Sequence, residues 1–363
     1  MIHDCTLQDR SRINYSMLTC TWPTRRRRVK ATISDIADIH IPKFGNKYRI
    51  QSMTKISMHK YAICVSDMND INQNVIYDVD AKSWDARRIG IDTMPATCVA
   101  RDGAFLIASS YHFIKVYFRD GKSGLIQIHA KSKLCKNGWL SSEGVCKQRG
   151  DYVYFIDRVR DLKSFKWSDI IGDIKGIDPK SCTIAKNVDD FVPADPMPAI
   201  LTEQKLLTLP NKKIVDLKAI SQHAAWAILH RIGKHWIVSG DLDGQAIIAS
   251  VNDSAKIKST ISVRLTSNGW PGTPSMFSIK TAIDRKAASF MLALERDGWS
   301  HLLAIDGVGR LTAIESLAAI ASDKVDYPDR YYRTVTAVAE GDEPGECYVC
   351  GYSWVKKIKV SIN

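Results

Sequence analysis

The sequence predicts an all-β protein: a single β-propeller of six or seven four-stranded antiparallel blades, with the ring closed by an N-terminal strand. Three observations carry this prediction. Short runs of β-branched and aromatic residues alternate with polar turns along most of the 363 residues. Groups of four such runs recur at a spacing of about 50 residues, which is the period of propeller blades. Helical patterns are scarce, and the best of them is the short segment Ser316–Ser322.

The clearest repeated unit spans residues 97–129. Asp-Gly pairs at 102–103 and 120–121 separate apolar runs, and such pairs favour tight hairpin turns because glycine readily adopts a positive φ. We therefore expect an antiparallel meander of four strands: Thr97–Arg101, Ala104–Ser109, His112–Arg119 and Gly124–His129.

Similar units begin near residues 48, 144, 223, 276 and 334. The wide interval between Trp167 and His223 contains the Pro- and Asp-rich stretch NVDDFVPADPMP. This interval is either a long insertion or a degenerate blade built from Ile200–Leu209 and Lys213–Ile220. We therefore place the propeller at residues 31–363, with an insertion or degenerate blade at about 168–222.

The last unit has three clear strands before the chain ends at Asn363. Closing the ring with a strand from the other terminus would leave few strand edges exposed. Candidates for this strand are Tyr15–Trp22 and Val29–Ile33, so residues 1–30 are interpreted as a basic N-terminal arm that contributes it. A pair of β-sandwiches is the main alternative, but it would not require near-constant spacing.

The segment Ile232–Val251, IGKHWIVSGDLDGQAIIASV, resembles the middle of a WD-repeat blade. In that family an apolar strand ends in Ser-Gly, an acidic glycine turn follows, and a second apolar strand begins. Ser239-Gly240 and Asp241–Gly244 match that order. The resemblance implies a WD-like propeller and a scaffold for protein contacts. Function, however, is a property of sites and does not follow from the fold.

Bulk properties exclude several classes. No apolar run approaches the ~18 residues needed to span a bilayer, so we expect no membrane insertion. The first residues lack the basic-then-apolar order of a secretory signal, and nine cysteines cannot all pair within one chain. We expect a cytoplasmic or nuclear protein.

Catalytic signatures are absent from the sequence, which contains no nucleophile elbow, P-loop or dinucleotide-binding glycine motif. Cys347 and Cys350 are three residues apart in one expected strand, so their side chains point to opposite faces and suit a core better than a metal. The Asp189-Asp190 pair is interpreted as solvated loop residues. We expect neither a catalytic site nor a bound metal or cofactor, although an enzyme or lectin with a central-channel site is retained as a second alternative.

Positive charge is the most distinctive feature, with a net charge of +12 that favours anionic partners. Four consecutive arginines follow Thr24, and further basic residues gather between His129 and Trp167 among aromatic residues that are able to stack on bases. The candidate contacts for nucleic acid or another anionic partner are Arg25, Arg26, Arg27, Arg28, Lys30, Lys131, Lys133, Lys136, Lys147, Arg149, Arg158 and Arg160.

Together these features predict a non-catalytic, WD-like propeller that serves as a protein-interaction scaffold in a larger assembly. Its expected partners are other protein subunits. The first alternative is an RNA- or DNA-binding propeller in a ribonucleoprotein, which would use a basic face.

Overall fold

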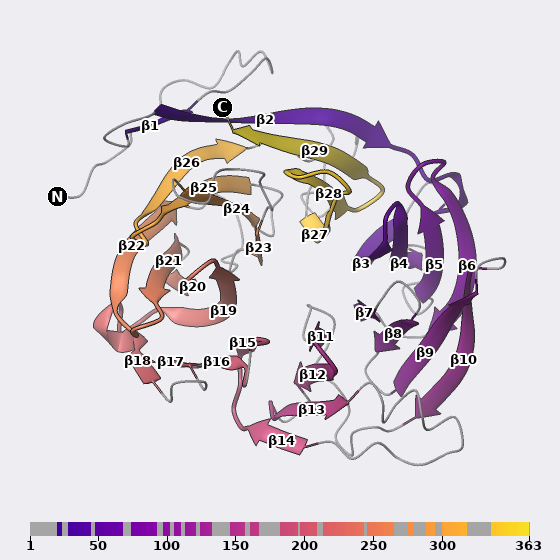
Figure 1. Ribbon diagram of the computed structural model, residues 1–363, viewed down its shortest axis with the longest axis horizontal. Helices are drawn as coiled ribbons and strands as arrows, with labels where there is room; N and C mark the ends of the chain where they lie inside the picture. The colour runs from indigo at the N-terminus through magenta and orange to yellow at the C-terminus, as the bar shows by residue number, and fades with distance from the viewer. Residues whose placement is uncertain are drawn as a thin grey trace.

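The computed structural model describes residues 20–23, 28–44, 48–67, 74–92, 97–101, 105–109, 113–120, 124–132, 146–156, 160–166, 182–194, 197–208, 213–242, 245–264, 275–278, 288–294, 300–317 and 335–362. Their strands pair into seven sheets, of which six have four strands and one has five. The sheets surround a central opening, as Figure 1 shows, so the prediction of an all-β propeller with four-stranded antiparallel blades is confirmed.

Each four-stranded sheet is a meander in which neighbours in sequence pair side by side. Sheet 1 contains β3 (Tyr48–Ser57), β4 (Lys60–Asp67), β5 (Asn74–Asp80) and β6 (Asp85–Asp92). Sheet 2 contains β7 (Thr97–Arg101), β8 (Phe105–Ser109), β9 (Phe113–Asp120) and β10 (Gly124–Ser132). Sheet 3 contains β11 (Cys146–Arg149), β12 (Tyr152–Ile156), β13 (Leu162–Lys166) and β14 (Cys182–Ala185).

Sheet 4 contains β15 (Asp190–Val192), β16 (Ala199–Thr202), β17 (Lys205–Thr208) and β18 (Lys213–Asp216). Sheet 5 contains β19 (Ala225–Ile232), β20 (His235–Leu242), β21 (Gln245–Asn252) and β22 (Ile257–Arg264). Sheet 6 contains β23 (Ser275–Ser278), β24 (Ala288–Leu294), β25 (Ser300–Asp306) and β26 (Leu311–Leu317). Sheet 4 lies within the interval from 168 to 222, which therefore holds a sheet of its own. The first two residues of the expected helix Ser316–Ser322 instead end β26.

The closing sheet joins the two ends of the chain. Its strands are β27 (Val335–Glu340), β28 (Glu346–Gly351), β29 (Val355–Ile362), β2 (Arg28–Ile39) and β1 (Cys20–Pro23), in the order β1-β2-β29-β28-β27. Antiparallel pairing of β2 with β29 runs from Ala31↔Ile362 to Ile39↔Val355, and it includes the last three residues of the candidate strand Val29–Ile33, whose first two pair with β1. A fifth strand at the outer edge departs from the expected four.

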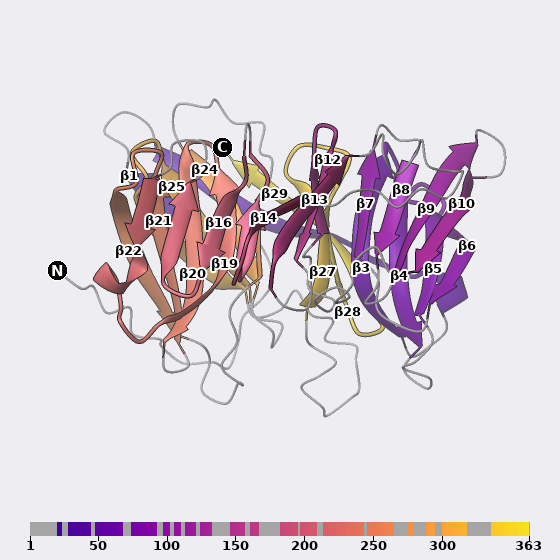
Figure 2. The same cartoon turned by 90° about the horizontal axis from the view of Figure 1, so that it is seen from below.

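The two ends of the ring differ in the turns they carry. In an antiparallel meander, the first and third turns lie at one end and the second turn lies at the other. We call the end with the first and third turns the front face, and the opposite end the rear face. First turns of neighbouring sheets meet at the front face, where Lys55 Nζ donates to Gly341 O at 2.5 Å. The front face is uppermost in Figure 2, where the hairpin between β11 and β12 turns, and it faces the reader in Figure 1.

The apolar core continues across the junction between sheet 1 and the closing sheet. Tyr61 and Tyr348 pack edge to face with ring centroids 5.2 Å apart, and the fully buried Cys350 donates to Met53 Sδ at 3.6 Å. Cys347 is not part of that core cluster, as expected for opposite strand faces. The chain ends are thus held together by shared packing as well as by the ladder of β2 and β29.

Candidate functional site

The twelve basic residues singled out from the sequence do not form one described cluster. Arg25, Arg26, Arg27, Lys133, Lys136 and Arg158 lie outside the described residues. Arg28 and Lys30 are backbone positions of β2, and Lys131 belongs to β10. The structure describes the side-chain contacts of the remaining three, Lys147, Arg149 and Arg160.

Lys147 is engaged within the protein. Its Nζ lies 2.6 Å from Asp190 Oδ1, donates to Phe191 O at 2.5 Å and sits 4.9 Å from the centroid of the Phe191 ring. Asp190 Oδ2 in turn accepts the backbone N–H of Leu229 at 2.8 Å. Asp190 therefore connects β11, β15 and β19, the innermost strands of three consecutive sheets in Figure 1.

Arg149 and Arg160 also face the protein. Exposed Arg149 donates through Nη1 to Pro193 O at 3.5 Å, and Arg160 forms an ion pair with Asp189. The interpretation of Asp189 and Asp190 as solvated loop residues is therefore wrong, because both carboxylates bind basic side chains of sheet 3. Each of these ion pairs partly neutralises a charge that the sequence offered to an external anion.

His230 on β19 lies beside this network. Burial, followed by the nearby Lys147 ammonium, lowers the pKa of His230 to about 4, although Asp190 acts in the opposite direction. Its Nε2 is buried and lacks a hydrogen-bond partner among the described residues. His230 is therefore neutral at physiological pH and adds no positive charge to the central opening.

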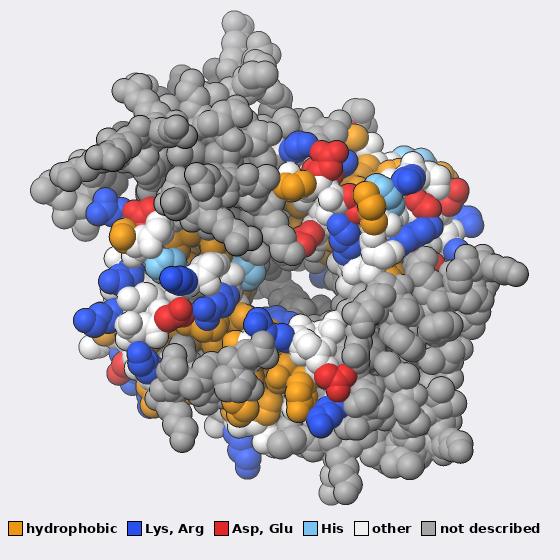
Figure 3. Space-filling view, viewed as in Figure 1, with side chains coloured by type: hydrophobic (Ala, Val, Ile, Leu, Met, Phe, Trp, Pro, Cys, Tyr) orange, Lys and Arg blue, Asp and Glu red, His pale blue; other side chains and the backbone are white. Residues whose placement is uncertain are grey.

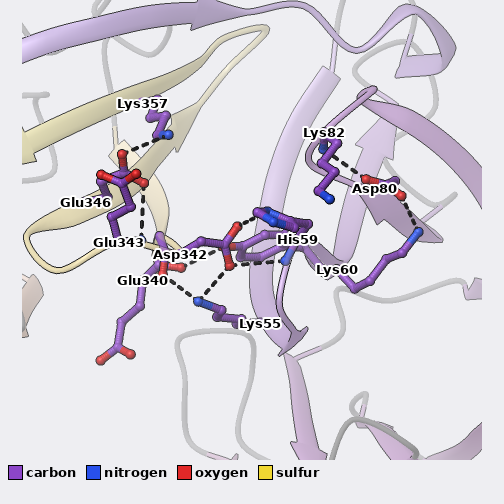
Figure 4. Close-up of polar contacts among 12 residues, drawn as sticks. Lys55, His59, Lys60, Asp80, Lys82, Glu340, Asp342, Glu343, Glu346 and Lys357 are labelled. Carbon is purple, nitrogen blue, oxygen red and sulfur yellow. Dashed lines mark hydrogen bonds and ion pairs between the residues drawn. The ribbon is translucent and has the colours of Figure 1, made fainter.

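A polar network joins the first turns of sheet 1 and the closing sheet, and Figure 4 shows it. Asp342 binds Lys55 Nζ at 2.9 Å and His59 Nδ1 at 2.6 Å, and it accepts the His59 backbone N–H at 3.1 Å. The hydroxyl of Tyr61 donates to Glu340 O at 3.0 Å. Burial opposes ionisation of Asp342, but the hydrogen bonds from Lys55 and the His59 N–H outweigh it and lower the pKa of this carboxyl. We call these residues the ring seam.

In the part of the chain that the structure describes, no group of three or more His, Cys, Asp or Glu side chains converges. Cys64, Cys347 and Cys350 are buried free thiols. Burial, with a smaller contribution from Glu346, raises the pKa of Cys347 to about 12, so its thiolate is scarce at neutral pH. No helix in the described ranges is long and apolar enough to cross a membrane.

Exposed apolar side chains gather at the front face, which sequence reasoning did not identify. Six large ones among the described residues are 37–70% exposed: Met58, Tyr152, Met197, Ile214, Ile257 and Val308. Three of them lie in first or third turns, and the other three are the first or second residue of the strand that follows such a turn. An apolar residue inside a polar turn, such as Val308 in DGVGR, is the only local signal of this property in the sequence.

Figure 3 shows the front face with hydrophobic side chains in orange. Orange surface is visible at several places around the described part of the ring, and it is most extensive beside the central opening, over the strands of sheets 3 and 4. Basic side chains are interspersed with it. The front face therefore offers apolar and positive groups together, a combination suited to a protein surface of opposite charge.

The chain resembles solved propeller structures but matches no family model and no curated protein sequence. The N-terminal domain of Nup159 superposes with a TM-score of 0.57 at 10% identity, over 91% of this chain and 95% of that one. A chain of the Saccharomyces cerevisiae Dbp5 structure with bound Nup159, Gle1, IP6 and ADP gives a TM-score of 0.55 at 11% identity, over 90% and 95%. At such identities the likeness establishes the β-propeller fold.

Proposed function

We propose that this protein is a non-catalytic propeller of the cytoplasm or nucleus that binds other proteins as a scaffold in a larger assembly. The single observation that carries the proposal is the placement of the large exposed apolar side chains, which, among the residues that the structure describes, all lie at the front face. Single exposed apolar residues are normal on a protein surface, but their concentration at one face is typical of an interaction site.

The solved structures with a similar fold support the same reading. One of them is a chain of the structure of Dbp5 bound to Nup159 and Gle1, so a propeller of this kind occurs in a complex of several proteins. Lys147 and Arg160 each form an ion pair within the protein, with Asp190 and Asp189 respectively. This is also in keeping with the proposal, because these two charges are less available to an external anion than the exposed apolar side chains are to a protein partner.

Co-purification of the tagged full chain from its native cells tests the proposal. We expect stoichiometric protein partners that are lost when Met58 and Ile214 are replaced by aspartate. Lys205→Glu is the matched control, because Lys205 is the exposed first residue of β17, directly after the second turn of sheet 4 at the rear face. A chain that is recovered without partners, or whose partners are lost equally in the rear-face variant, would contradict the proposal.

A further inference from the structure

Three turns of sheets 5 and 6 meet at Gly309 on the front face. Ser250 of β21 donates its hydroxyl to Gly309 O. A Cβ on Gly309 would lie 2.7 Å from His235 Nδ1 and 3.1 Å from Lys258 Cβ, and the residue has a φ of +91°. Only glycine fits this contact, which joins the turns into one continuous surface.

Two of these turns are built alike and are held firmly in place. Asn252 Oδ1 accepts the N–H groups of Ser254 and Lys256 at 3.1 and 2.9 Å, and Asp306 Oδ1 accepts those of Val308 and Arg310 at 3.0 and 2.8 Å. Each turn has one residue with positive φ, Ala255 in the first and Gly309 in the second. Such hydrogen-bonded turns present their side chains with little ordering cost on binding.

Both turns present an exposed aliphatic side chain. Val308 is 67% exposed, and Ile257, which begins β22 directly after the other turn, is 37% exposed. Val308 adjoins Gly309 on the side of sheet 5 that faces sheet 6, whereas Ile257 pairs with Val251 and shares the side that faces sheet 4. The two side chains therefore lie on either side of the front end of sheet 5, where they form an apolar centre for an incoming chain.

Basic side chains surround that centre and outnumber the acidic ones. Lys234, Lys256, Lys258 and Arg310 are exposed and form no ion pair with any residue that the structure describes. Of the two carboxylates in these turns, Asp253 pairs with Arg231 at 3.1 Å, and Asp306 is occupied by backbone N–H groups. The positive charge is therefore left available to a partner.

We propose that this surface, made by Ile257, Val308, Lys234, Lys256, Lys258 and Arg310, binds an acidic peptide segment of a partner protein that carries apolar side chains. The inference rests on the proposed function and names a partner chemistry for one part of the front face. Carboxylates of the segment meet the four basic residues while separate apolar side chains of the segment cover Val308 and Ile257. The apolar residues of this surface are aliphatic, whereas sequence-tolerant binding of single-stranded nucleic acid relies on aromatic side chains that stack on bases.

Selection of a displayed library of random 12-residue peptides on the immobilised full chain tests the inference. We expect enrichment of sequences that combine Asp or Glu with Leu, Ile, Phe or Met. Fluorescence anisotropy with an enriched, labelled peptide should then show that Val308→Asp, and separately the pair Lys256→Glu and Arg310→Glu, weaken binding by roughly tenfold or more. All three positions are exposed, so thermal unfolding by circular dichroism should confirm that the variants remain folded.

Ile214→Asp on sheet 4 is the matched control, because Ile214 is a 60% exposed front-face residue outside this surface. It should leave the peptide affinity unchanged. Peptides that bind but are weakened by Ile214→Asp, and not by Val308→Asp, would overturn this inference and keep the proposed function. Failure to enrich any peptide would overturn this inference alone, because co-purification of the full chain tests the proposed function separately. Competition by a 20-nucleotide poly(U) that is sensitive to Lys256→Glu and Arg310→Glu, but indifferent to Val308→Asp, would assign the surface to nucleic acid instead.

Discussion

The ring seam and the Gly309 surface are both built from first and third turns at the front face, yet they use their polar groups in opposite ways. At the seam, Asp342 binds Lys55 and His59 across the junction and is itself only 7% exposed. At the Gly309 surface, Asn252 and Asp306 bind the backbone of their own turns, and the exposed Lys256, Lys258 and Arg310 form no ion pair with a described residue.

This difference shows how one fold supplies both closure and recognition. The seam must hold sheets that are formed by opposite ends of the chain, so its charges are paired with each other and partly buried. Sheets 5 and 6 are consecutive in the chain and are joined by packing between strands, as Ile237 and Ile305 of one core cluster illustrate. The exposed basic side chains at these turns are therefore available to an external partner.

The largest expected effect comes from removing β2. Deletion of residues 1–39 leaves the edge of β29 unpaired, and we expect a loss comparable with the whole stability of a domain, about 5–15 kcal/mol, or self-association through the free edge. Deletion of residues 1–27 removes β1 and keeps the pairing of β2 with β29, so it should stay folded. Size-exclusion chromatography and thermal unfolding measure both. A monomeric, cooperatively folded protein lacking residues 1–39 would show that the ring does not depend on this strand.

The next largest effect is a difference in lost stability between a variant of the ring seam and a variant of the Gly309 surface. Asp342→Ala leaves Lys55 and His59 without their shared partner, and we expect a destabilisation of about 2–4 kcal/mol in urea unfolding. The matched Asp253→Ala removes the partner of Arg231 at a site where the carboxylate is 45% exposed, and should cost less than about 1 kcal/mol. Equal losses for the two variants would remove the distinction between a paired seam and an open surface.

The pH dependence of Asp342 sharpens the same contrast. Its pKa is lowered in the folded protein, so its contribution to stability is present above the ordinary carboxyl pKa of about 3.9 and is lost as the pH falls through the folded value. The stability difference between the native protein and Asp342→Asn should therefore be largest near neutral pH and shrink in acid. A difference that is independent of pH would mean that the ionised carboxylate does not hold the seam.

A smaller effect is expected at the inner wall of the ring. The folded pKa of His230 is about 4, below its ordinary value of 6.5, so the unfolded chain binds a proton more readily than the folded one between these values. The free energy of unfolding should fall as the pH is lowered from about 6.5 to about 4, and His230→Gln should flatten this part of the profile. The exposed His223→Gln is the control, and an unchanged profile in His230→Gln would refute the assignment.

The smallest expected effect concerns the binding of nucleic acid by the basic N-terminal arm, which stays a prediction. If the basic arm contacts phosphates, replacement of Arg25–Arg28 by alanine should reduce the salt-dependence slope of RNA binding by up to about 3. Lys147→Ala should leave that slope unchanged and lower stability, since Lys147 binds Asp190. A change of slope in the Lys147 variant, or no RNA binding at low salt, would count against this account of the charges.

Local patterns in the sequence were sufficient for the strands. The expected strand Thr97–Arg101 is β7, and Gly124–His129 lies within β10, because Asp-Gly turns and β-branched runs act over a few residues. Trp84 follows the third strand of sheet 1 and packs against Tyr348 of the closing sheet with ring centroids 5.3 Å apart. That contact depends on ring closure and has no local signature.

The candidate site was harder to predict from the sequence, because it also depends on contacts between residues that are far apart in the chain. Lys147 and Asp190 are 43 residues apart, and nothing near either one indicates that neighbouring sheets bring them together. The front-face concentration of Met58, Ile214 and Val308 likewise depends on which turns share an end of the ring. The number of charged residues can be read from the sequence. Which of them form ion pairs with each other depends on how the sheets are arranged around the ring.

Cross-linking mass spectrometry of the native assembly tests the central claim most directly. Exposed lysines occur on both ends of the ring, with Lys82, Lys213 and Lys256 at the front face and Lys186, Lys205 and Lys218 at the rear. If the front face binds protein partners, amine-reactive cross-links to other proteins should concentrate on the first three. Cross-links concentrated on Lys186, Lys205 and Lys218 would contradict it.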